Sequence, residues 1–364
     1  MLYFVIVTRV CNLHCIYCGN EPDPSVEPLE ISYDIKDLKR FIEKDPEPII
    51  AFYGGEPLLR INIIEEIMDS IRARHWVLQT NGLFLNKLDP DYLVRFDTIL
   101  VSIDGRPEVT NYYRGPRTYE RILRNIKLIR ERGFRGDLIA RMAVSERTDI
   151  YADVKHLLQL KDPGFDHVHW QLDVLWDSPP YQRYKNFDKW VREIYNPGIS
   201  KLVEYWYEEM IEKGRVLGIV PFIGVMKTLL KGEKTYLRCG VGIDAFTITT
   251  SGRIIACPIA PEFDWNFLGD IWSTGPKDLP WRIAVGEPCT SCDIYHLCGG
   301  RCLFANKTML WGIDGFRKVC QTVKHLINEL EKVKPKIEKL IEKGVISEED
   351  FDYPPFNNSV EIIP

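Results

Sequence analysis

Short apolar runs, rich in β-branched residues, alternate with amphipathic stretches through the first half of the chain. The apolar runs predict strands at 2–8, 48–53, 75–80, 98–104, 137–144 and 167–175. The amphipathic stretches predict helices near 33–44, 61–73, 89–95, 118–132 and 151–160. A repeated strand–helix unit predicts a parallel sheet with its helices outside. Six strands are too few for a closed eight-stranded barrel, so we expect an α/β fold, an open and partial (β/α)6 TIM-like barrel.

The second half of the chain has a different pattern. It predicts an aromatic-rich helix near 187–213 and a charged amphipathic helix near 321–343. Between them, short strands and turns carry seven cysteines. We therefore expect a barrel at 1–180, a bridging region at 181–235, a cysteine-rich domain at 236–325, and a C-terminal helix with a loosely held tail at 326–364.

Composition narrows the class of protein. With 45% hydrophobic and 27% charged residues, the 364-residue chain is typical of a soluble globular protein. A net charge of −5 gives no broad attraction to nucleic acid or to an anionic membrane. The apolar start, MLYFVIV, is too short for a signal peptide or a spanning helix, so we expect a cytoplasmic protein. Ten cysteines at short spacings in a reducing compartment then indicate metal rather than disulfides.

Three cysteines follow the first predicted strand in the sequence CNLHCIYC. Cys11, Cys15 and Cys18 have the spacing C-x3-C-x2-C, with Tyr17 just before the last. In a partial barrel, ligands bind at the C-terminal ends of the strands, and this loop lies at such an end. A structural zinc site takes four ligands, so three cysteines leave one metal position open for chemistry. The alternative is a zinc site with a distant fourth ligand.

The spacing of this loop, with its aromatic residue, resembles the signature of the radical SAM superfamily. In that family the three cysteines hold a [4Fe–4S] cluster whose open iron binds the amino and carboxylate groups of S-adenosylmethionine (SAM). An electron passed through the cluster breaks the sulfonium C–S bond and releases a 5′-deoxyadenosyl radical. The resemblance implies that Cys11, Cys15 and Cys18 are the catalytic cluster ligands here.

Further stretches resemble the parts of this family that bind SAM. The sequence FYGGEPLL (52–59) is similar to the GGEP motif, in which glycines let the backbone approach the methionine end of SAM. The resemblance implies cofactor contacts from Tyr17, Gly54, Gly55, Glu56, Ser102, Arg114 and Leu175. Glu56 would accept from the ammonium group, and Ser102 would meet the carboxylate and ribose. Arg114 would reach the carboxylate, and Leu175 would pack on the adenine. The alternatives are an ordinary Gly-Gly turn, a surface arginine and a core leucine.

The C-terminal cysteines resemble, spacing for spacing, the seven-cysteine pattern of the SPASM domain. That domain carries two auxiliary Fe–S clusters, which makes three [4Fe–4S] clusters in all. By family pattern, the first auxiliary cluster takes Cys239, Cys257 and Cys302, and the second takes Cys289, Cys292, Cys298 and Cys320. Zinc is the alternative for this stretch alone, because C-x2-C pairs are common zinc ligands.

Two residues depart from the family pattern. Ala245 stands near the place where some relatives have a further cysteine, so one iron of the first auxiliary cluster is open or is bound by Asp244, water or a substrate thiolate. Pro258 follows Cys257 where enzymes that mature sulfatases have an aspartate, which weakens that interpretation.

The resemblance implies a peptide- or protein-modifying oxidoreductase. Its radical would abstract hydrogen from a peptide residue, and oxidation with an auxiliary cluster as electron acceptor would give a thioether or C–C crosslink, or a related change. The implied partners are a peptide or protein substrate and an external electron donor like ferredoxin or flavodoxin, with no nucleic acid and no membrane. One alternative is a radical SAM enzyme acting on a small molecule or cofactor precursor. A more distant one is a non-enzymatic zinc or Fe–S protein.

Two groups of side chains near the barrel mouth have open roles. His167 and His169 alternate on a predicted strand, so they share one face and either point into the barrel or serve its structure. Aromatic residues crowd the junction between domains and either pack there or line a peptide groove: Trp170, Trp176, Tyr181 and Tyr184.

Overall fold

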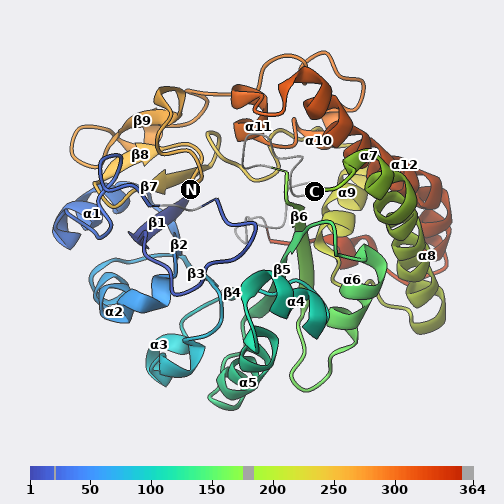
Figure 1. Ribbon diagram of the computed structural model, residues 1–364, viewed down its shortest axis with the longest axis horizontal. Helices are drawn as coiled ribbons and strands as arrows, with labels where there is room; N and C mark the ends of the chain where they lie inside the picture. The colour runs from blue at the N-terminus through green and yellow to red at the C-terminus, as the bar shows by residue number, and fades with distance from the viewer. Residues whose placement is uncertain (20–21, 175–183, 355–364) are drawn as a thin grey trace.

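A computed structural model describes residues 1–19, 22–174 and 184–354 of the chain. Nine strands form one sheet in the order β6-β5-β4-β3-β2-β1-β7-β8-β9. The first six are parallel and curve around the centre of the molecule in Figure 1. They are β1 Leu2–Thr8, β2 Ile49–Gly54, β3 His75–Thr80, β4 Thr98–Ser102, β5 Asp137–Val144 and β6 His167–Leu172. The predicted open, partial barrel is therefore confirmed.

Helices follow the strands and cover the outside of the sheet. The predicted helices are present as α1 Ile35–Ile42, α2 Ile61–Ser70, α3 Pro90–Leu93, α5 Thr118–Glu131 and α6 Ile150–Gln159. The sequence pattern missed α4 Pro107–Arg114 and the short 3-10 helices η1 Pro57–Arg60 and η2 Leu85–Lys87. Helix α4 begins with a proline in its first turn, where the missing N–H costs nothing. Val109 is its only aliphatic residue, so its apolar pattern is weak.

The C-terminal half continues the same sheet. Strand β7 Ala245–Ile248 pairs in parallel with β1, and β8 Arg253–Ile255 and β9 Phe267–Asp270 follow antiparallel. The bridging region forms α7 Phe187–Trp190, the π-helical turn η4 Val191–Tyr195, α8 Asn196–Lys213 and α9 Val220–Lys231. The remaining elements are η5 Asp264–Asn266, η6 Pro276–Asp278, α10 Tyr295–Cys298, α11 Leu303–Thr308, α12 Gly312–Glu342 and η7 Glu348–Phe351.

The two faces of the barrel strands bury different sets of side chains. Alternate residues point outward and pack against the helices, as Val5, Phe52 and Leu78 do in the main core. The opposite residues form a smaller apolar layer inside the barrel: Leu2, Phe4, Ala51, Val77, Leu100, Ile139 and Ala245. This layer closes the lower part of the barrel, so open space remains only toward the C-terminal ends of the strands.

The segment after α12 is anchored, so the expectation of a loosely held tail is wrong for 348–353. Phe351 is fully buried, and its ring packs edge-on against Trp206 of α8 at 5.8 Å between centroids. Tyr353 donates a hydrogen bond to Asp137 at 2.5 Å and packs against the ring of His167. Residues 355–364 lie outside the described part of the chain.

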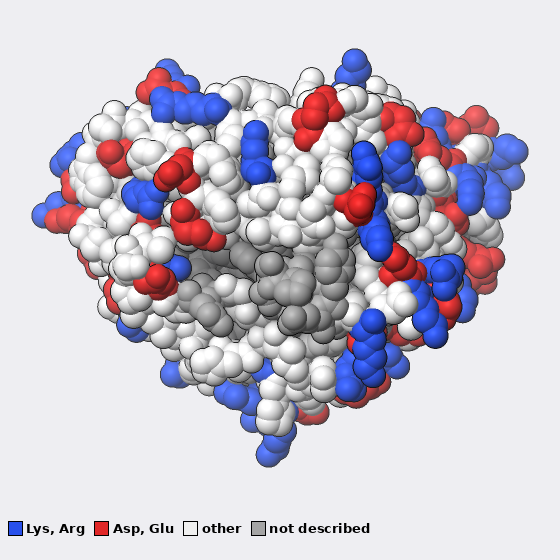
Figure 2. Space-filling model, turned by 45° about the horizontal axis from the view of Figure 1, so that its top comes forward, with Lys and Arg blue, Asp and Glu red and all other residues white. Residues whose placement is uncertain are grey.

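The surface carries no strong bias of charge on the face shown in Figure 2, where basic and acidic side chains are interspersed. Across the described residues, no helix is long and apolar enough to cross a membrane.

Removing the ring of Phe351 tests how firmly the last described segment holds the fold. Because the side chain is fully buried, we expect Phe351→Ala to lower the free energy of unfolding by about 3 kcal/mol. Ile211→Ala, on an exposed part of α8, is the matched control and should have almost no effect. Urea unfolding of both variants measures the difference. Equal stability of the two would mean that the tail detaches before the rest unfolds.

Candidate active site

A cavity of about 930 Å³ opens at the C-terminal ends of the barrel strands. Its walls combine two distant parts of the sequence. The loop after β1 contributes Cys11, Cys15 and Cys18, and the C-terminal half contributes Cys239, Cys257 and Cys302. The barrel supplies polar groups between them, among them Tyr53, Gln79, Ser102, Arg114, Arg141 and Gln171. The cavity is large enough for a cofactor of the size of SAM together with part of a second molecule.

The N-terminal cysteines lie close enough for their charges to interact. Burial raises the pKa of Cys11, and it raises that of Cys15 to about 11, although Arg114 acts against the second shift. Desolvated thiols of this kind remain protonated until a bound cation stabilises the thiolates. Among the residues that the structure describes, no three His, Cys, Asp or Glu side chains converge tightly enough for a single metal ion.

A buried carboxylate holds the cysteine loop on the barrel. Asp104 is fully buried and accepts hydrogen bonds from the Tyr17 hydroxyl at 2.7 Å and from the Ala143 N–H at 2.9 Å. It also binds the Arg114 guanidinium through two bonds of 2.8 Å, from Nε and Nη2. The loop, β5 and the end of α4 are thereby tied to one side chain. Tyr17 and Arg114 serve this network, and their contact with SAM stays a prediction.

The two glycines of the GGEP stretch lie against the start of the cysteine loop. A Cβ atom on Gly54 would lie 2.1 Å from the Thr8 carbonyl oxygen, and one on Gly55 would lie 2.2 Å from that of Val10. The backbone N–H of Gly55 donates to the Thr8 carbonyl at 2.9 Å. Only glycine permits this close approach, and both residues border the cavity.

Glu56 is fully buried, which sets its position apart from that of the glycines. Its carboxylate accepts from the Thr80 hydroxyl and the Asn81 N–H, each at 2.7 Å, and from the Leu58 N–H at 2.9 Å. These bonds brace the end of β2 against the end of β3. Burial raises the pKa of Glu56 to about 7, despite the donors that lower it. A contact with the SAM ammonium group stays a prediction.

Side chains just above the inner apolar layer form a polar wall. Ser102, Arg141 and His169 are register partners on β4, β5 and β6, so their side chains share the inner face. The sequence pattern did not single out Arg141, because its strand was interpreted as an apolar run. A charged residue inside such a run, at a position that faces the barrel interior, was the available signal. His169 is fully buried and contacts Arg141, whereas His167 pairs with Asp137 at 2.8 Å.

The C-terminal cysteines fall into two groups. The thiolate charges of Cys239, Cys257 and Cys302 interact with one another at the cavity, and burial raises the pKa of Cys239 to about 12. In the second group the charge of Cys289 interacts with those of its partners, Cys320, Cys298 and Cys292. Burial raises the pKa of Cys289 to about 12 and that of Cys320 to about 11. The structure thus brings together the cysteines that the family resemblance groups, and their role as cluster ligands stays a prediction.

Arg301 lies between the two C-terminal cysteine groups. It is 5% exposed, and its Nε and Nη2 atoms have no hydrogen-bond partner among the described residues. Its charge acts on Cys298 and Cys320. A buried guanidinium without a partner is costly, and an anionic iron–sulfur cluster held by these thiolates would offset that cost. The C-terminal thiols, with the buried charge of Arg301 beside them, therefore fit an iron–sulfur cluster.

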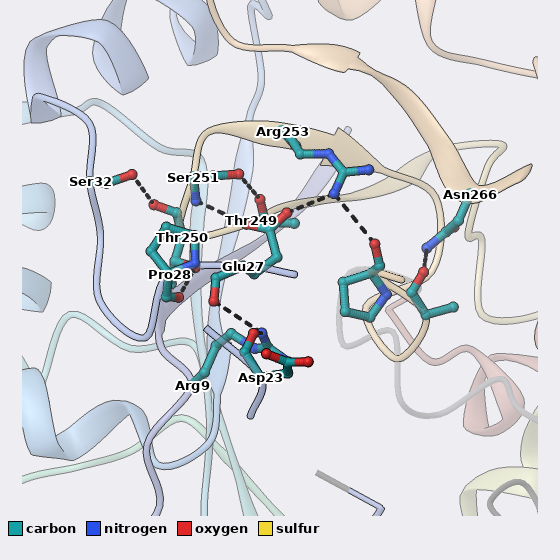
Figure 3. Close-up of polar contacts among 12 residues, drawn as sticks. Arg9, Asp23, Glu27, Pro28, Ser32, Thr249, Thr250, Ser251, Arg253 and Asn266 are labelled. Carbon is teal, nitrogen blue, oxygen red and sulfur yellow. Dashed lines mark hydrogen bonds and ion pairs between the residues drawn. The ribbon is translucent and has the colours of Figure 1, made fainter. Parts of the chain in front are cut away.

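A set of polar contacts joins the loop after the cysteine motif to the C-terminal hairpin (Figure 3). Glu27 is 1% exposed and accepts from Arg253 at 3.1 Å and from the Ser251 N–H at 3.2 Å. The Thr250 hydroxyl donates to the Pro28 carbonyl at 2.5 Å. The two cysteine-bearing walls of the cavity are thus held at a fixed separation.

Six further residues were singled out in the sequence. Leu175, Trp176 and Tyr181 lie outside the described residues. Trp170 and Tyr184 are buried, and Trp170 donates to the Tyr195 hydroxyl at 3.0 Å, so these two pack in the core. The charge of Asp244 acts on Cys239, and burial raises the pKa of its carboxyl group. Its role as a ligand stays a prediction.

The raised pKa of Glu56 has a consequence for stability. The folded state holds a proton on Glu56 up to about pH 7, whereas the unfolded state releases it near pH 4.5. Stability therefore falls as pH rises through this window, by roughly 3 kcal/mol at most. We expect Glu56→Gln to remove this part of the pH dependence. Urea unfolding of metal-free wild-type protein and of Glu56→Gln at pH 5 and pH 8 measures how the free energy of unfolding changes with pH. An equal change in the two proteins would contradict the assignment.

Comparison with known proteins identifies the barrel. Residues 5–160 match the model of the Radical SAM superfamily. Over 340 residues, the chain is 24% identical to the mycofactocin maturase MftC of Mycobacterium tuberculosis (strain CDC 1551 / Oshkosh), covering 85% of this chain and 80% of that protein. The superfamily match implies SAM and one [4Fe–4S] cluster.

Solved structures share the whole architecture. The structure of native anSMEcpe with bound AdoMet and Cp18Cys peptide has a TM-score of 0.71 at 21% identity, covering 94% of this chain and 99% of that one. SuiB of Streptococcus suis bound to its precursor peptide SuiA has a TM-score of 0.57 at 16% identity, covering 83% and 72%. At these identities the likeness concerns the fold. The match over residues 5–160 identifies the barrel as a radical SAM domain, and together with the maturase relative it supports a radical SAM enzyme.

Proposed function

We propose that this enzyme modifies a peptide or protein by radical chemistry and oxidises it to a crosslinked or otherwise altered product. The observation that carries the proposal is one cavity with Cys11, Cys15 and Cys18 on one side and Cys239, Cys257 and Cys302 on the other. A substrate in that space lies between a site that generates a radical and a site that can accept an electron. A thioether or C–C crosslink is the expected outcome.

The relatives support a peptide substrate. MftC is named a maturase, and solved structures of similar fold hold a Cp18Cys peptide or the precursor peptide SuiA. We extend this substrate class to the present chain. The cavity of about 930 Å³ supports the extension, because it lies between the two groups of cysteines and would bring a substrate and SAM together in one space.

Three [4Fe–4S] clusters are part of the proposal. Cys11, Cys15 and Cys18 would hold the one that binds SAM. The two C-terminal groups described above would hold the auxiliary clusters. Arg301, buried between those groups, supports this assignment because its charge has no counter-ion among the described residues.

The chain's own residues prepare the site for this chemistry. When bound, SAM and its cluster would supply a 5′-deoxyadenosyl radical, which abstracts hydrogen from C–H bonds and must be kept from groups other than the substrate. Asp104 fixes the cysteine loop through Tyr17 and Arg114, while Gly54 and Gly55 bring the backbone to the cavity wall. The apolar inner layer below closes the barrel to solvent. An external donor of the ferredoxin or flavodoxin type, in the cytoplasm, would supply the electron.

The direct test uses peptides encoded near this gene. The reconstituted enzyme is incubated anaerobically with each peptide, SAM and a reductant, and the products are examined by mass spectrometry. We expect a loss of two mass units, as removal of two hydrogens in a crosslink requires. Turnover of a free amino acid or tetrapyrrole, with every peptide inert, would replace this proposal with the small-molecule alternative.

A cysteine variant separates the radical-generating site from the auxiliary sites. We expect Cys15→Ala to abolish formation of 5′-deoxyadenosine, because only two ligands remain for the SAM-binding cluster. The C-terminal iron and sulfide should remain. Cys320→Ala is the matched control and should lose C-terminal iron while still cleaving SAM. Protein that contains zinc and no iron would contradict the enzyme assignment.

A further inference from the structure

Arg141 places a positive charge on the cavity wall, and its described side-chain contacts are with neutral groups. The residue is half-buried, and it borders the cavity from β5. Its Nη1 contacts the Nδ1 atom of His169, and its Nη2 donates to the Gln171 Oε1 atom at 2.9 Å. Both partners are neutral when they accept from a guanidinium. No ion pair joins Arg141 to an acidic side chain in the described part of the chain.

The environment makes this charge expensive. Burial lowers the pKa of Arg141 to about 10, because desolvation disfavours its charged form. The other cation on this wall, Arg114, is already neutralised by Asp104. A buried charge without a partner is strongly unfavourable, whereas one that receives a ligand carboxylate gains a charge-assisted and often bidentate bond.

Four acidic residues border the cavity, and in the described structure none forms an ion pair with Arg141. Glu262 is exposed and its charge acts on Cys257, while Asp23 accepts from the Ser25 N–H. Asp173 accepts from the Ser145 hydroxyl at 2.7 Å, and Glu27 pairs with Arg253 at 3.1 Å.

Both side-chain partners of Arg141, His169 and Gln171, belong to β6, whereas Ser102, implied for SAM, belongs to β4 on the other side of β5. The guanidinium is therefore held toward β6, away from the strand that carries Ser102.

We propose that Arg141, oriented by His169 and Gln171, is the receptor for a carboxylate of the substrate, either the C-terminal carboxylate of a peptide or an Asp or Glu side chain. This inference rests on the proposed function, and it narrows the substrate class to peptides that bring a carboxylate to the radical site. Arg141 binds and positions the substrate. Its planar fork, held on two edges by neutral acceptors, leaves the remaining N–H groups for the ligand.

Three peptide libraries test the inference and separate the two sources of carboxylate. All are N-acetyl pentapeptides with randomised positions. The first has a free C-terminal carboxylate and no Asp or Glu, the second is its C-terminal amide, and the third is an amide with one Asp or Glu. Each is mixed anaerobically with the reconstituted enzyme and SAM. Peptides retained after rapid size exclusion are counted by mass spectrometry.

We expect wild-type enzyme to retain the first or the third library roughly 10- to 100-fold better than the second, as a charge-assisted hydrogen bond implies. Arg141→Gln should remove this preference. Arg121→Gln, which removes an exposed charge from α5, is the matched control and should keep it. SAM binding, measured by equilibrium dialysis, should be the same in all three proteins.

Each other outcome counts against the inference. Equal retention of all three libraries, or a preference that survives in Arg141→Gln, overturns it and leaves the proposed function standing. Loss of SAM binding in Arg141→Gln reassigns the residue to the SAM carboxylate. Retention of no peptide by an enzyme that still cleaves SAM would overturn the peptide function itself. If circular dichroism shows that Arg141→Gln is misfolded, Arg141→Lys replaces it. The inference then requires that wild-type enzyme prefers the carboxylate libraries over the amide library and that this preference is weaker in Arg141→Lys.

Discussion

The arrangement of the site depends on one buried carboxylate. Asp104 follows the end of β4 and is fully buried. It accepts four hydrogen bonds: one from Tyr17, two from Arg114 and one from the Ala143 N–H. A carboxylate is stable at that depth only when donors and a cation surround it. The cysteine loop, α4 and β5 must therefore meet at this point. Once they do, three thiols face the cavity from a fixed direction.

Much of the fold was predictable because the sheet is parallel and buried on both faces. Such strands are continuous apolar runs, and β1, β3 and β5 have the bounds that the sequence pattern predicts. Helices with a long amphipathic period, such as α5, were equally clear. Helix α4 was not clear, because Val109 is its only aliphatic residue. The anchoring of Phe351 was hidden because a single buried aromatic residue in a polar tail gives no periodic signal.

The candidate site was predictable in its thiols and much less so in its polar residues. Cysteine spacing encodes a ligand set directly, and the structure brings together the groups that the family resemblance implies. The polar residues depend on burial, which no spacing reveals. Glu56 has the position of a cofactor contact in the sequence, yet its carboxylate braces two strand ends. Arg141 had no motif at all, and only its inward register on β5 gives it a place in the cavity.

The pairing of β7 with β1 constrains how the polypeptide matures during translation. β1 is made first, but one of its edges has no neighbour until residues 245–248 have left the ribosome. An unpaired apolar edge is a template for association with other chains. The nascent protein must therefore wait through more than two hundred residues of synthesis, or be shielded by a chaperone, before its central sheet is complete.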